Sequence, residues 1–222
     1  MLASAMAHVP CGGAVLLGDV SIPADCSGLV VFAHGSGSGR HSPRNKLVAQ
    51  GLQQHGFATL LLDLLTEAEE RVDLHTREHR FDIALLAERM VCATRWAADE
   101  PALKKLPVGY FGASTGSAAA LVAAAELGPA VSAVVSRGGR PDLAGPAALQ
   151  KVVSPTLLIV GGYDQAVIEM NEAAYGRMHC TRALKVIAGA GHLFEEAGTL
   201  ERVADFAAGW FESHLAHAAM NA

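Results

Sequence analysis

The stretch Gly112-Ala113-Ser114-Thr115-Gly116 constrains this chain more than any other. A short apolar run precedes it and an alanine-rich run follows it, so the sequence predicts a buried strand that turns over Ser114 and continues as a helix. The two glycines would let strand and helix pass closely around a strained serine. Such a Gly-x-Ser-x-Gly turn typically exposes a nucleophilic hydroxyl. The alternative is a glycine-rich turn that only joins a strand to a helix.

Continuous apolar runs predict most of the other strands, because strands buried on both faces of a parallel sheet lack a polar face. After a weaker strand or hairpin at 14–22, largely apolar runs occupy residues 28–33, 57–62, 106–111, 130–135 and 156–160, and a short strand is expected at 184–187. Helical patterns separate them, the clearest being at 43–55, 81–98 and 199–215. We therefore expect a doubly wound α/β fold: a mostly parallel sheet of about seven to eight strands with helices on both faces.

Two segments show little regular pattern. Residues 63–80 are charged and have no clear apolar face, so we expect a loop with at most a short helix. Residues 136–151 are rich in Gly and Pro, and a short helix around Ala147 is the most that they suggest. No internal repeat or linker interrupts the sequence. We expect a single domain over residues 1–222, in which residues 1–27 form an N-terminal strand or hairpin extension.

Composition argues against several classes of protein. No apolar stretch reaches the ~18 residues that span a bilayer, and the N-terminal segment has no Lys or Arg and too short an apolar run for a signal peptide. We therefore expect a cytoplasmic protein. Its net charge of −5 gives no general attraction to nucleic acid or anionic membranes. The four cysteines form no C-x-x-C pair, and we expect reduced thiols at Cys11, Cys26, Cys92 and Cys180.

A serine nucleophile needs a base to take its proton and an acid to orient that base. His192, in a glycine-flanked turn after the last predicted strand, is the candidate base for Ser114. Asp164, directly after the strand at 156–160, is the candidate acid, and Asp142 is the alternative. Because the carboxyl ends of parallel strands meet at one edge of a sheet, these residues are expected to come together there. A loop histidine without a role and a helix-capping aspartate are the alternative interpretations.

The oxyanion that forms during attack on a carbonyl needs preorganised donors. The N–H of Thr115 is one candidate, and the N–H of Ser36, in the loop after the strand at 28–33, is the second. Gly35 in that loop would permit close approach. The loop lacks the Gly-Lys-Ser/Thr ending of a phosphate-binding P-loop, which argues against a nucleotide. No metal-ligand cluster stands out either, so we expect neither a metal nor a cofactor.

Taken together, these motifs resemble those of the α/β-hydrolase superfamily and are most similar to its small dienelactone hydrolase-like members. The resemblance covers about residues 28–215 and lies in four segments: 33–37 (Ala-His-Gly-Ser-Gly), 112–116, 160–164 (Val-Gly-Gly-Tyr-Asp) and 191–192 (Gly-His). Dienelactone hydrolase has a cysteine where this chain has Ser114. The resemblance therefore implies cleavage of an ordinary small ester, thioester or lactone through an acyl-enzyme. An acyl transferase or a non-catalytic ligand-binding module would fit the same motifs.

The resemblance also implies an open, shallow site, because only residues 136–154 are available to form a lid. Arginines near the predicted site add a hypothesis about the small-molecule substrate. Arg40, His41 and Arg44 follow the loop of Gly35, and Arg137 stands at a strand end. Arginine binds carboxylate and phosphate well, so the substrate could be anionic, with Arg137 and then Arg40 as the binding candidates. The alternative is that these arginines pair with acidic residues of the 63–78 loop.

Overall fold

The computed structural model describes the backbone of residues 2–219 and the side chains of residues 2–215. This part of the chain forms one eight-stranded sheet in the order β1-β2-β4-β3-β5-β6-β7-β8. The strands are β1 (Leu2–Cys11), β2 (Ala14–Pro23), β3 (Gly28–Ala33), β4 (Phe57–Leu62), β5 (Val108–Ala113), β6 (Val131–Arg137), β7 (Thr156–Gly161) and β8 (Arg182–Ile187). β1 and β2 form an antiparallel hairpin at one edge, and β3 to β8 run parallel. The expected mostly parallel sheet is confirmed.

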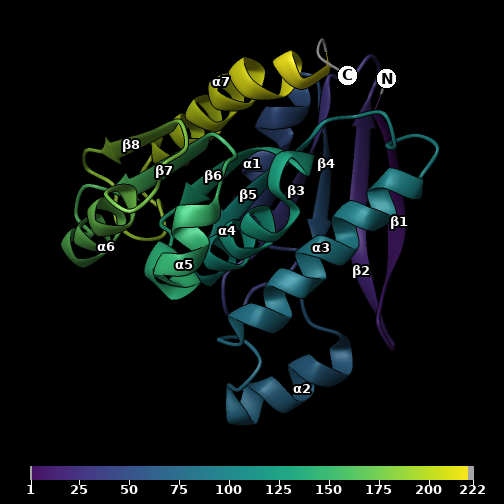
Figure 1. The fold of residues 1–222 in the computed structure, drawn as a ribbon, viewed down its shortest axis with the longest axis horizontal. Coiled ribbons are helices and arrows are strands. Elements are labelled where there is room, and N and C mark those ends of the chain that lie inside the picture. The colour runs from purple at the N-terminus through teal and green to yellow at the C-terminus, as the bar shows by residue number, and fades with distance from the viewer. Residues whose placement is uncertain (1, 220–222) are drawn as a thin grey trace.

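Helices cover both faces of the sheet, as the sequence predicts (Figure 1). The helices are α1 (Pro43–Gln54), α2 (Glu67–Thr76), α3 (Ile83–Asp99), α4 (Thr115–Leu127), α5 (Gly145–Lys151), α6 (Gln165–Tyr175) and α7 (Thr199–Ala219), with short 3-10 turns η1 (Gly128–Ala130) and η2 (Pro141–Ala144). α3, α4, α5 and α6 pack on one face, and α1 and α7 pack on the other. None of the helices in residues 2–219 has both the length and the apolar character needed to cross a bilayer.

Two hydrophobic cores explain why the strand sequences are apolar without alternation. In β3, Leu29 and Val31 point to the core beneath α3 and α4, whereas Val30 and Phe32 point to the core beneath α1 and α7. Each residue of this strand is therefore buried on one face or the other. The alanine-rich helix α4 lies against the sheet with most of its small side chains buried, because helices with small residues can approach their neighbours closely.

The charged segment 63–80 contains a regular helix, α2, where the sequence suggested little more than a loop. Its N-terminus is closed by a capping box: the Glu69 N–H donates to the Thr66 hydroxyl at 3.2 Å, and the Thr66 N–H donates to the Glu69 carboxylate at 2.7 Å. After the helix, the backbone N–H groups of His79 and Arg80 both donate to buried Asp73, each at 2.9 Å. The Thr-x-x-Glu spacing is the signal that sequence reasoning missed.

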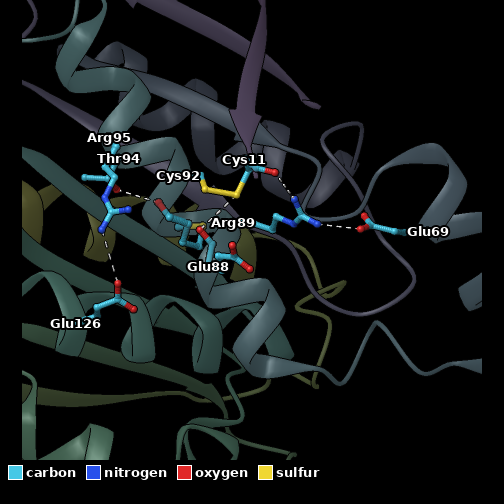
Figure 2. The surroundings of a disulfide bond; sticks show 9 residues. Cys11, Glu69, Glu88, Arg89, Cys92, Thr94, Arg95 and Glu126 are labelled. Carbon is cyan, nitrogen blue, oxygen red and sulfur yellow. Dashed lines mark hydrogen bonds and ion pairs between the residues drawn. A yellow bond between two sulfur atoms is a disulfide. The ribbon is translucent and has the colours of Figure 1, made fainter. Parts of the chain in front are cut away.

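A disulfide joins Cys11 at the end of β1 to Cys92 in α3, so the expectation that all four cysteines are reduced is wrong for this pair (Figure 2). Eighty-one positions separate the two residues, and only the packing of the hairpin on α3 brings their Cα atoms to 5.5 Å. Arg89, one turn earlier in α3, donates to the Cys11 carbonyl at 3.2 Å and to the Glu69 carboxylate at 2.8 Å. The N-terminal hairpin, α3 and the start of α2 are thus linked.

Replacing Cys11 and Cys92 together by serine should lower the free energy of unfolding by about 2–4 kcal/mol. The disulfide closes a long loop in the unfolded chain, and the unfolded chain gains conformational entropy when this cross-link is removed. Urea denaturation without reductant measures the difference. The matched control is the Cys26→Ser/Cys180→Ser pair, whose thiols are free and half-buried and should matter much less. Equal stability of both double variants, or free thiols at all four positions by mass spectrometry, would contradict the structure.

Candidate active site

Ser114 occupies the junction between β5 and α4 in an unusual backbone conformation, with φ 50° and ψ −122°. Hydrogen bonds on both sides hold this turn. The Ser114 N–H donates to the Arg137 carbonyl at 3.2 Å. Its own carbonyl accepts from the Ser117 N–H at 3.1 Å, the Ser117 hydroxyl at 2.7 Å and the Arg140 N–H at 3.1 Å. A positive φ at a non-glycine residue costs energy, and these contacts stabilise it at a residue with a reactive side chain.

The glycines on either side of Ser114 are required by packing. A Cβ on Gly112 would lie 2.5 Å from the Cα of Ser117, and a Cβ on Gly116 would overlap the carbonyl oxygens of Ala33 and His34. Strand β5, helix α4 and the end of β3 therefore meet without room for a methyl group. Gly35 faces the serine directly, since a Cβ there would approach the Ser114 Cβ to 3.0 Å. The reason given for the Gly-x-Ser-x-Gly spacing thus holds in the structure.

His192 and Asp164 meet across two neighbouring loops at the same edge of the sheet. The Nδ1 atom of His192 lies 2.5 Å from Oδ2 of Asp164. The loops are held together by the Tyr163 N–H, which donates to the Ala190 carbonyl at 2.9 Å. The Gly191 N–H donates to both carboxylate oxygens of Glu196, at 3.0 and 3.1 Å. Glu196 therefore fixes the residue before His192, a role that nothing in the sequence indicated.

Asp142, the alternative acid, has a different partner. Its two carboxylate oxygens accept hydrogen bonds from the Arg140 guanidinium at 2.9 and 2.8 Å. These bonds are the main reason that the pKa of Asp142 lies below its usual value. Among the described residues, His192 pairs with Asp164, and Asp142 pairs with Arg140. Of the two aspartates, it is Asp164 that contacts the imidazole.

A cavity of about 220 Å³ brings the candidate nucleophile and base together. Its lining comes from the ends of β5 and β6, the loop after β3, the start of α1 and the loop after β8. The lining residues are Gly35, Ser36, Ser38, Ser42, Arg44, Asn45, Ala113, Ser114, Arg137, Gly138, His192 and Leu193. Five of the eight residues predicted for the site line this cavity: Gly35, Ser36, Ser114, Arg137 and His192.

Ser36 and Thr115, the two candidate oxyanion donors, also lie together. The Ser36 N–H donates to the Thr115 hydroxyl at 2.9 Å, so this amide already has a partner. Thr115 is buried and is the first residue of α4, where the helix dipole favours negative charge. The loop is anchored by His34, whose Nε2 accepts the Leu64 N–H at 3.0 Å while its Nδ1 bonds the Gly35 carbonyl at 2.9 Å. Burial lowers the pKa of His34, which keeps the ring neutral.

The arginines that sequence reasoning grouped together separate in the structure. The Arg40 guanidinium pairs with Asp63 and lies 3.5 Å from Asp19, and its backbone N–H donates to Asp63 at 2.6 Å. Arg40 is not among the residues that line the cavity of Ser114, and its pair with Asp63 agrees with the alternative of internal pairing. Arg137 does line the cavity, and so does Arg44, which the sequence gave no reason to prefer over Arg40.

A second, smaller cavity of about 70 Å³ shares Gly35, Ser36 and Ser38 with the first. Helix α2 lines it through Glu70, Asp73 and Leu74, and Leu65 and Leu86 add two further apolar side chains. Helix α2 therefore forms one wall of the space next to Ser36, whereas the cavity that contains Ser114 has no lining residue from α2.

Solved structures of other proteins share the fold of this chain. The crystal structure of a dienelactone hydrolase from Anabaena variabilis matches with a TM-score of 0.94 and 56% sequence identity, covering 96% of this chain and 99% of that one. Est1E from Butyrivibrio proteoclasticus matches with a TM-score of 0.78 at 16% identity, covering 94% of this chain and 98% of that one, and so shares the fold. No family model matches the chain.

Two Mycobacterium tuberculosis proteins, from different strains, are also similar to this chain. Each bears the name "putative phosphoribosyl transferase" and is 56% identical over 208 residues. The match covers 94% of this chain and 46% of each relative. The chain thus spans a little under half the length of these relatives.

Proposed function

We propose, from the premise that this chain belongs to the dienelactone hydrolase-like α/β-hydrolases, that it is a serine hydrolase of small carboxylic esters, thioesters or lactones. The observation that carries the proposal is the contact of His192 Nδ1 with Asp164 Oδ2 at 2.5 Å, on the rim of the cavity that contains Ser114. A carboxylate that holds one nitrogen of the imidazole orients the other toward a serine hydroxyl. That arrangement supports the catalytic roles proposed below.

In the first half of the reaction, the Ser114 oxygen attacks the carbonyl carbon while His192 Nε2 takes the hydroxyl proton. The negative charge moves to the carbonyl oxygen, where the Thr115 N–H and the Ser36 N–H would donate to it. The Ser36 amide bonds the Thr115 hydroxyl in this structure, so it must share its hydrogen with the oxyanion. As the tetrahedral intermediate collapses, His192 returns the proton to the leaving alcohol or thiol, and the acyl group stays on Ser114.

In the second half, water replaces the leaving group. His192 accepts a proton from this water as its oxygen attacks the acyl carbon, and it then gives the proton to the Ser114 oxygen as the carboxylic acid departs. Asp164 stabilises the imidazolium in both halves without being protonated itself. The acid, the alcohol or thiol and the free enzyme account for all atoms, and no cofactor takes part.

A fluorophosphonate probe tests the nucleophile without knowledge of the natural substrate. The wild-type protein should be labelled at Ser114, as identified by peptide mass spectrometry, and the Ser114→Ala variant should not be labelled. Hydrolysis of a panel of short acyl esters should be abolished by the same probe. An unlabelled wild-type protein would favour a binding module over an enzyme, whereas transfer of the acyl group to added alcohols in preference to water would favour an acyl transferase.

A further inference from the structure

Arg137 is positioned beside the candidate nucleophile by the backbone. It is the last residue of β6 and pairs in register with Ala113, the residue before Ser114. The Arg137 carbonyl also accepts the Ser114 N–H at 3.2 Å. Because two neighbouring strands of one sheet fix both residues, the relative position of their Cα atoms does not depend on a mobile loop. The side chain lines the cavity that contains Ser114 and His192.

Among the described residues, no carboxylate forms an ion pair with Arg137. The side chain is buried, with 7% of the residue exposed, and its Nη1 atom has no hydrogen-bond partner in the described part of the chain. The other deeply placed arginines are paired: Arg80 with Asp73, and Arg89 with Glu69. None of the ion pairs found among residues 2–215 includes Arg137. A buried guanidinium without a partner is costly, so such a group usually has a ligand or a function.

A second arginine adds to the positive charge of the cavity. Arg44, in the first turn of α1, lines the same cavity, and its Nη1 lies 3.5 Å from the exposed carboxylate of Glu195. Its buried Nε has no hydrogen-bond partner among the residues that the structure describes. Burial and the charge of Arg44 lower the pKa of Arg137 to about 10, so the Arg137 guanidinium remains charged at neutral pH. The carboxylate of Asp164 is directed to His192.

We propose that Arg137, assisted by Arg44, binds an anionic group of the substrate next to Ser114. This inference rests on the proposed function and narrows it to small esters that carry a carboxylate or a phosphate. The planar guanidinium matches both groups through paired N–H donors. Binding would supply the missing counter-charge and hold the scissile carbonyl against Ser114. A cavity of about 220 Å³ suits a compact substrate of this kind.

Matched pairs of esters test the proposal. Monoethyl succinate is compared with ethyl butyrate, and 2-acetoxyethyl phosphate with ethyl acetate; the first pair tests a carboxylate and the second a phosphate. The wild-type protein should prefer the anionic member of at least one pair. Arg137→Met should lower kcat/KM for that member at least about tenfold, mainly through KM, and change the neutral member less than about twofold. Arg137→Lys and Arg44→Ala should show smaller losses of the same kind.

Arg95→Ala is the charge-matched control, because Arg95 is exposed on α3, 4.0 Å from Glu126, and outside the cavity. It should leave both members of each pair unchanged. Labelling of Ser114 by an uncharged fluorophosphonate shows that each variant is folded. Equal rates on anionic and neutral esters in the wild-type protein, or equal losses on both in Arg137→Met and in Arg44→Ala, would overturn the anion site.

Calorimetry separates this inference from the proposed function. Succinate or inorganic phosphate should bind to the Ser114→Ala protein and should bind at least about tenfold more weakly when Arg137→Met is added. Binding that depends on Arg137 in a protein that cleaves none of the esters would refute the hydrolase and keep the anion site. Ester hydrolysis without anion binding would refute the anion site and keep the hydrolase.

Discussion

Replacing Ser114 by alanine is expected to lower kcat for short acyl esters by roughly 10⁴- to 10⁶-fold, because no other group can form the acyl-enzyme. Ser114 is held at the end of β5 by four hydrogen bonds to its backbone, so alanine should keep the same turn. The oxyanion donors and the cavity then remain, and a residual rate above that of water is expected from them. Initial rates with a chromogenic acetate ester, measured against enzyme-free solution, give the ratio.

Ser114→Gly makes a useful companion variant. It should be equally inactive, yet about 1 kcal/mol more stable than Ser114→Ala in urea denaturation, because glycine adopts φ 50° without the strain that a Cβ imposes. Lower stability of the glycine variant would argue against stored strain at this turn. Substantial ester hydrolysis by either variant, beyond a contaminating activity that the fluorophosphonate removes, would refute Ser114 as the nucleophile.

The sequence predicts best those features that depend on one strand and its end. Buried parallel strands are continuous apolar runs, and this signal locates β3, β5 and β7 to within a residue or two. The chain continues past each strand at the same edge of the sheet, so Ser36, Ser114 and Asp164 could be expected near one another before any coordinates. The glycines around Ser114 report close packing of β5 on α4, which is again a local requirement.

Contacts between side chains that are far apart in the sequence could not be predicted from single strands and their ends. Cys11 and Cys92 are separated by 81 positions and approach only because the hairpin packs on α3. Arg40 and Arg44 lie four residues apart with similar surroundings in the sequence, yet Asp63 holds the first, while the second lines the cavity. The fold places the carboxylate of Asp63 near Arg40 and not near Arg44. The periodicity of the sequence does not predict which arginine this carboxylate will meet.

Helix α2 is an intermediate case. Its sequence has no apolar face, so the pattern that identifies most helices is missing. The structure stabilises it instead with a capping box at Thr66 and Glu69, with the ion pair of Glu69 with Arg89, and with buried Asp73. The capping box is readable from the sequence, but the contact with Arg89 of α3 is not. The helix lines the smaller cavity next to Ser36, beside the cavity that contains Ser114.

Asp164→Asn should lower kcat by about 10⁴-fold while changing KM little, as expected when a triad aspartate becomes an amide. Asp164 accepts from His192 Nδ1 at 2.5 Å, and this contact selects the tautomer whose Nε2 can take the Ser114 proton. An asparagine can instead donate to Nδ1, which favours the wrong tautomer and leaves Nε2 protonated. Asp142→Asn is the matched control, because that carboxylate bonds Arg140 and not His192.

The two aspartate variants distinguish the alternatives that the sequence left open. Each removes one negative charge from a residue that follows a strand of the same sheet, so a general electrostatic effect would slow both. Asp142→Asn should retain kcat within about threefold and lose at most about 1 kcal/mol of stability, since its pair with Arg140 is partly exposed. Asp164→Asn should remain folded and inactive across the pH range in which the wild-type protein works. A loss of activity confined to Asp142→Asn would transfer the acid's role to that residue and require the loop of His192 to move away from Asp164.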